Sequence, residues 1–143
     1  MKTLVKDRPF DEISIGDKAK FTKTVSAKDV ESFAEITGDR NPVHLDEEFA
    51  ANSMFKRRIV HGMLSASLIS TVLGTDLPGA NTIYMSQEVK FLAPVFLGDT
   101  LTAVIKVIEK KEDKRTLTFH TVVKNQDGKT VVDGQAKVMK AKN

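Results

Sequence analysis

Residues 62–74 read GMLSASLISTVLG, and this stretch decides the fold. Its apolar side chains cover more than one face of a helix, which predicts a long helix from Gly62 to Gly74 that is buried nearly all round. A transmembrane helix needs about 20 predominantly apolar residues. Serine and threonine interrupt the wider apolar stretch 59–77. We therefore expect a core helix and no membrane span.

The segments after this helix predict strands near residues 82–93, 100–110, 115–125 and 130–140. In the second of these, Leu101, Ala103 and Ile105 alternate with Thr100, Thr102 and Val104, as in a strand with one buried face. A first strand is expected at 18–25. Helices collected on one side of an antiparallel sheet make an α+β fold. The pattern fits a sheet curved around the one long central helix.

Between the first strand and the central helix, the sequence predicts shorter helices and a loop. Ser26 has the properties of an N-cap, and Asp29 three residues later completes a short capping box. Apolar residues at helical spacing follow as far as Gly38, which ends that helix. Residues 38–44, GDRNPVH, are rich in turn formers and predict a loop. Residues 46–52 are expected to form a short helix.

Length and composition fit one domain, residues 1–143. The chain has a net charge of +3 and no basic arm, so we expect no nucleic-acid partner. A small positive charge is compatible with a ligand that carries phosphates. The absence of cysteine excludes disulfides and thiolate metal sites. It also fits a reducing compartment, and we expect a cytoplasmic protein.

Two side chains in the 38–44 loop are suited to proton transfer. Asp39 and His44 lie five residues apart across a segment stiffened by Pro42. A carboxylate beside an imidazole forms an acid–base pair, because histidine titrates near neutral pH. Spacing alone favours a simpler interpretation, in which Asp39 caps the next turn and His44 lies at the surface.

A second candidate position is the start of the central helix. The first turn of a helix presents free N–H groups and partial positive charge, which stabilise an oxygen that gains negative charge. Gly62 would let a ligand approach these groups, although it could equally serve only tight packing. We interpret His61 as a helix cap or a core histidine. His120, in a strand pattern, is assigned no role, and the three histidines do not form a metal-site pattern.

Three segments together resemble one family, the MaoC-like (R)-specific enoyl-CoA hydratases. They are residues 34–50 (AEITGDRNPVHLDEEFA), residues 59–64 (IVHGML) and residues 84–99 (YMSQEVKFLAPVFLGD). The Gly-Asp-x-Asn-Pro-x-His core is specific, and the resemblance covers nearly the whole chain. It implies a hot-dog fold, usually dimeric, that acts on acyl-CoA thioesters without a cofactor or metal. Relatives often have Arg-Pro where this chain has Arg57-Arg58.

The same resemblance implies roles for six residues. Asp39 and His44 would be the catalytic pair, and the Gly62 N–H would receive the thioester oxygen. For the substrate site, Asn41 would support the active-site loop, and Ser70 and Leu73 would line the acyl pocket.

The expected reaction is reversible hydration of trans-2-enoyl-CoA to (3R)-3-hydroxyacyl-CoA, with short acyl chains. Two alternatives stay open. One is the same fold acting as an acyl-carrier-protein dehydratase or a thioesterase, and the other is a non-catalytic acyl-CoA-binding protein.

Overall fold

The computed structural model describes residues 4–142. Five strands form one antiparallel sheet in the order β1-β3-β4-β5-β2, so β1 and β2 are its edges. Their bounds are β1 (Lys18–Thr24), β2 (Thr82–Phe91), β3 (Thr100–Lys111), β4 (Thr116–Lys124) and β5 (Thr130–Lys140). The five predicted strands are confirmed, because each observed end lies within two residues of the expected one.

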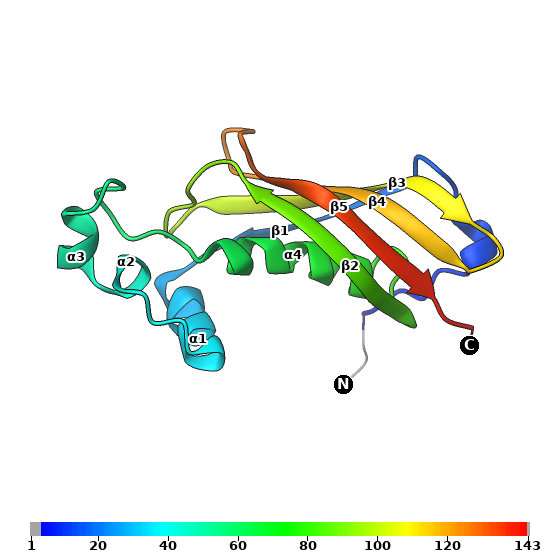
Figure 1. Cartoon of the computed structure of the whole chain (residues 1–143), viewed down its shortest axis with the longest axis horizontal. Coiled ribbons are helices and arrows are strands. Elements are labelled where there is room, and N and C mark those ends of the chain that lie inside the picture. Colours follow the sequence, from blue (N-terminus) through cyan, green and yellow to red (C-terminus); the bar gives the residue numbers. More distant parts are fainter. Residues whose placement is uncertain (1–3, 143) are drawn as a thin grey trace.

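The long helix α4 (Gly62–Thr75) lies along one face of the sheet (Figure 1). Buried side chains of the helix, such as Ile69 and Leu73, pack with buried strand residues such as Ile105 and Phe119 in one core. This is the α+β, hot-dog arrangement predicted from the sequence. Within residues 4–142 no helix is long and apolar enough to cross a membrane.

Helix α4 differs from its prediction in one respect, because it is not buried nearly all round. Met63 is 60% exposed. Ser67, Ser70 and Gly74 continue an exposed stripe along the same helix. The sheet covers only one side of α4, and no other element of the described chain covers this stripe.

Three short helices gather beyond the N-terminal end of α4 (Figure 1). They are α1 (Ala27–Thr37), α2 (Pro42–Leu45) and α3 (Glu47–Ala51), and a 3₁₀ turn η1 (Phe10–Glu12) precedes β1. The predicted capping box is confirmed, since Ser26 and Asp29 each accept the other's backbone N–H. Gly38 ends α1 in the left-handed region, with φ of 81°.

Helix α2 corrects the prediction that residues 38–44 form a loop throughout. Pro42 occupies the first turn of α2, where its fixed φ suits a helix and its missing N–H costs nothing. The side-chain oxygen of Asn41 accepts the Val43 N–H at 3.3 Å and so caps the helix. The residues that indicate a turn are thus also helix-start residues, and His44 projects from a helix.

Candidate active site

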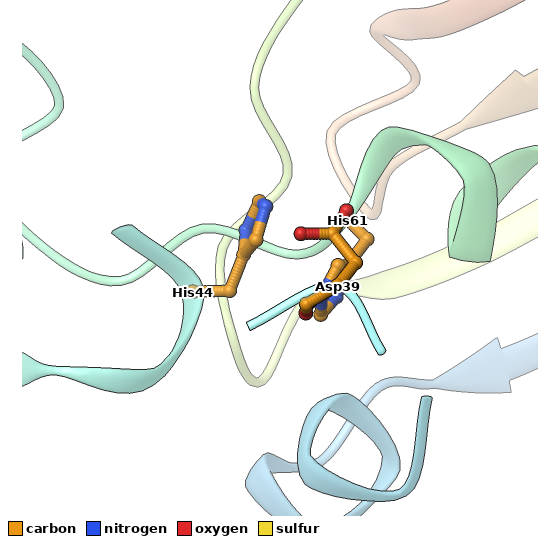
Figure 2. Close-up of side chains that lie close together, drawn as sticks. All are labelled: Asp39, His44 and His61. Atoms are coloured by element: carbon orange, nitrogen blue, oxygen red, sulfur yellow. The ribbon is translucent and has the colours of Figure 1, made fainter. Parts of the chain in front are cut away.

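Three titratable side chains meet where the α1–α2 loop passes the start of α4. A carboxylate oxygen of Asp39 and one ring nitrogen from each of His44 and His61 lie within 4.8 Å of one another (Figure 2). Asp39 is exposed, whereas His44 and His61 retain only 8% and 2% of their accessible surface. The structure therefore brings the predicted pair together and adds a third group to it.

The His44 ring has one nitrogen fixed and one available. Its Nδ1 lies 2.9 Å from the carbonyl oxygen of Ile59. A carbonyl can only accept, so Nδ1 carries the hydrogen and donates it. In the neutral ring, Nε2 therefore keeps its lone pair and can accept a hydrogen bond or a proton.

Burial lowers the pKa of His44 below its usual value, and a nearby His61 acts in the same direction. The hydrogen bond to Ile59 and the Asp39 carboxylate oppose this effect. A lowered pKa means that the ring stays neutral to a lower pH. His44 can therefore serve as a proton acceptor under neutral conditions.

The residues before α4 hold the backbone around His44. The Nε of Arg58 donates to the His44 carbonyl oxygen at 2.7 Å, and the Ile59 N–H donates to the Val43 carbonyl at 3.2 Å. Arg58 also lies 3.6 Å from Glu47. Of the basic residues 56–58, Arg58 is thus turned toward α2 instead of toward solvent. A proline at this position could not make the bond to His44.

Asn41 acts on the backbone of the loop. Besides capping α2, it donates its N–H to the Asp39 carboxylate at 3.3 Å. This bond orients the carboxylate of Asp39, and the supporting role that the resemblance implies for Asn41 stays a prediction. Asn41 does not line the cleft that Asp39, His44 and His61 border.

His61 joins the parts of the site to one another. Its Nε2 lies 3.0 Å from the backbone carbonyl oxygen of Asp39 and donates to it. Its ring stacks on His44 at 3.9 Å and contacts the Phe33 ring at 4.9 Å. The sequence interpretation as a core histidine is confirmed by the burial, but its contacts with Asp39 and His44 were not predicted. The only sequence signal was its position directly before Gly62.

A carboxylate and two histidines can also form a metal site. Here the two rings are stacked, with an angle of 28° between their planes. The lone pair of an imidazole nitrogen lies in its ring plane, so the lone pairs of two stacked rings lie in separate planes and are poorly placed to share one ion. This geometry suits proton transfer better than metal coordination.

The three groups border a cleft of about 530 Å³. Apart from Asp39, His44, His61 and Ser65, its lining is apolar or glycine, comprising Phe55, Ile59, Val60, Gly62, Met63, Phe91, Leu92, Ala93, Pro94, Val95, Val131 and Val132. Such a cleft, mostly apolar with a few converging polar groups, is typical of a small-molecule site.

Gly62 opens α4 at this cleft, and the N–H groups of a first helical turn have no acceptor within the helix. A Cβ at residue 62 would lie only 2.8 Å from the Phe91 ring. The close approach of Phe91 supports the packing interpretation of Gly62. The interpretation that its N–H receives an oxygen stays a prediction. Ser70 and Leu73 lie farther along α4 and outside the lining of the cleft, the first exposed and the second buried in the core.

Comparison with known proteins relates this fold and site to one family. The MaoC like domain matches residues 11–133. An (R)-specific enoyl-CoA hydratase of Rhodospirillum rubrum is 46% identical over 130 residues, which cover 91% of this chain and 90% of the relative. A 3-hydroxybutyryl-CoA dehydratase of Methylorubrum extorquens is 43% identical over 90% of this chain and 82% of its own length.

A solved structure agrees with these matches. The unliganded R-hydratase PhaJ1 of Pseudomonas aeruginosa superposes with a TM-score of 0.92 at 46% identity, covering 97% of this chain and 89% of that one. The family match spans residues 11–133, which include the Asp39–His44 loop and the start of α4. The chain belongs to the family of proteins with a MaoC-like domain.

Proposed function

We propose that this protein is an (R)-specific enoyl-CoA hydratase, which adds water reversibly to trans-2-enoyl-CoA to give (3R)-3-hydroxyacyl-CoA. One observation carries the proposal: a carboxylate and a neutral imidazole meet at an apolar cleft that begins at a helix N-terminus. The Rhodospirillum relative is named for this hydration, and the Methylorubrum relative is named for the reverse reaction, a dehydration. A cytoplasmic location, expected from the cysteine-free sequence, is part of the proposal.

In the proposed reaction, Asp39 and His44 bind the attacking water between them. The ionised carboxylate and the Nε2 of His44 are both acceptors, and one water supplies two donors. The water oxygen keeps its lone pairs for attack on C3 of the enoyl chain. The pair takes up one water proton and returns a proton to C2, so that one water is added across the double bond.

Gly62 supplies the electrostatic part of the proposed mechanism. Its backbone N–H would donate to the thioester carbonyl oxygen. This oxygen gains negative charge when water has added to C3 and the substrate is an enolate. The partial positive charge of the α4 N-terminus acts in the same direction. This makes C3 electrophilic without a metal or cofactor.

We propose a preference for short acyl chains. The resemblance implies Leu73 as the limiting side chain and Ser70 beside it on α4, and in this structure both lie beyond the lining of the cleft, with Leu73 in the core behind it. The name of the Methylorubrum relative, which specifies a four-carbon substrate, supports the short chain. We expect Leu73→Ala to raise the ratio of octenoyl-CoA to crotonyl-CoA efficiency about 10-fold, because apolar contacts discriminate by about 1–3 kcal/mol per methylene. The ratio is the measurement of choice, since it does not depend on the fraction of folded enzyme.

Leu68→Ala is the matched control for Leu73→Ala. Both leucines are buried on α4, at 5% and 1% exposure, so truncation of either costs about 2–5 kcal/mol of stability. Leu68→Ala should leave the ratio unchanged. An unchanged ratio in Leu73→Ala would remove Leu73 as the limiting side chain.

We also propose a homodimer joined through β2. This edge strand exposes Ile83 at 46%, Tyr84 at 39% and Met85 at 54%, whereas the other edge, β1, carries Lys18, Lys20 and Lys23. An unpaired apolar edge favours pairing with another strand, and lysines oppose it. The uncovered stripe of α4 would also be buried if a second copy joined here.

We expect light scattering at micromolar concentration to give about twice the 15.8 kDa chain mass. Met85→Lys should shift the protein toward monomer, because it places a charge on the joining edge. Ile36→Lys is the control, since Ile36 is 85% exposed on α1. A stable and active monomer of the unsubstituted protein would contradict the dimer.

Crotonyl-CoA tests the activity directly. The protein should remove the enoyl-thioester absorbance, and an (R)-specific dehydrogenase should oxidise the product. Release of free thiol would indicate a thioesterase instead. Binding of crotonyl-CoA without turnover would indicate the non-catalytic alternative.

A further inference from the structure

His61 takes no part in the proposed proton transfers, although it is the most buried of the three clustered groups. It retains 2% of its accessible surface and lies between the rings of Phe33 on α1 and His44 on α2. It also precedes Gly62, the first residue of α4. His61 thus contacts α1, α2 and the loop between them, and it directly precedes α4.

The two members of the proposed catalytic pair are anchored to different extents. His44 is tied to residues 58–59 through its ring, its own carbonyl and the carbonyl of Val43. Apart from its bond to His61, the hydrogen bonds described for Asp39 join it only to Thr37 and Asn41, its neighbours in the loop. Among the described residues, the ring of His61 provides the one hydrogen bond from Asp39 to a distant part of the chain, 22 residues away.

We propose that His61 is a positioning residue, whose Nε2–H holds the Asp39 backbone so that its carboxylate stays within reach of His44. The inference rests on the proposed hydratase function. The hydrogen bond fixes the loop on one side of the ring, and the stacking contact fixes His44 on its face. One rigid side chain therefore sets the distance between the two groups that bind the water.

The second nitrogen of His61 argues against a purely packing role. Its Nδ1 is buried and has no hydrogen-bond partner among the described residues. A buried polar atom without a partner lowers stability, and an apolar side chain of the same shape removes that cost. Phenylalanine would fill the same space between two rings. Histidine is the better residue here only if its N–H is needed.

Two variants separate the N–H from the ring. His61→Phe keeps an aromatic ring but loses the donor to Asp39. His61→Gln loses the ring but places an amide N–H close to the position of Nε2. If His61 positions Asp39, His61→Phe should lower kcat for crotonyl-CoA hydration about 10²-fold, as expected when a reacting group is misplaced by about 1 Å. KM should stay within about threefold, because phenylalanine keeps an aromatic ring at the border of the cleft.

His61→Gln should recover most of the lost kcat, and His61→Phe should melt at or above the temperature of the unsubstituted protein. If His61 had only a structural role, the order of the two kcat values would be reversed. The more stable variant, His61→Phe, would then also be the more active one. The proposal is overturned if His61→Phe keeps its kcat, or if both variants lose kcat equally at unchanged melting temperatures.

Hydrogen exchange of the peptide that spans residues 34–45 gives a readout without turnover. His61→Phe should exchange faster in this peptide than the unsubstituted protein, whereas His61→Gln should not. If the unsubstituted protein fails to hydrate crotonyl-CoA, the proposed function falls, and this comparison still decides the role of His61. Equal exchange in all three proteins would overturn it.

Discussion

Asp39→Asn and His44→Asn are each expected to lower kcat/KM for crotonyl-CoA about 10²–10⁴-fold, the contribution of a positioned acid or base. Asparagine at position 39 keeps the shape of the side chain but removes its charge and much of its basicity. Asparagine at position 44 can still donate to the Ile59 carbonyl, as Nδ1 does now. The change therefore removes Nε2 while retaining the anchor of α2.

The double variant tests whether the two residues act on one water. Groups that act as a unit do not contribute additively, so Asp39→Asn/His44→Asn should be little worse than the poorer single variant. Losses that multiply would mean independent roles. The product of the unsubstituted protein should be the (3R) alcohol, and a (3S) product or full activity in Asp39→Asn would refute the assignment.

His120→Gln is the control for loss of a histidine. His120 lies on β4, half exposed, and its Nε2 is 2.9 Å from a carboxylate oxygen of Asp133. It is not part of the cleft lining. Its substitution should leave kcat/KM unchanged, and thermal melting should show that all of these variants are folded.

Gly62→Pro is expected to lower kcat about 10²–10³-fold, the usual effect of removing one oxyanion donor. Proline suits this position in other respects. It is favoured at the first residue of a helix, and the preceding His61 already has the extended backbone, ψ 131°, that a following proline requires. The substitution therefore removes the N–H with little expected change to α4.

The contact with Phe91 must be removed before this comparison is clean. Any Cβ at residue 62 would meet the Phe91 ring at 2.8 Å. We therefore expect the informative pair to be Gly62→Ala and Gly62→Pro, both in a Phe91→Ala background. Alanine retains the N–H and proline does not, while both add a Cβ. Equal kcat values in the two variants would show that Gly62 serves packing alone.

Much of this fold could be predicted from the sequence, because its signals are local. The alternation of Leu101, Ala103 and Ile105 reflects the two-residue period of a strand with one buried face. The Ser26–Asp29 capping box needs only backbone groups three residues away. Asp39 and His44 lie in one short segment, so their proximity was also open to prediction.

The tertiary structure decided what depends on packing between distant segments. Because local periodicity carries no record of what covers a helix, the sequence did not predict the exposed stripe at Met63 and Ser70. The Arg58 side chain donates to the His44 carbonyl oxygen only because α2 lies beside it. His61 reaches Asp39 across 22 residues because α1, α2 and α4 converge at one end of the sheet. The sequence, through the resemblance of its motif, predicted Asp39 and His44 as a pair. The packing of these helices decided that His61 contacts both of them.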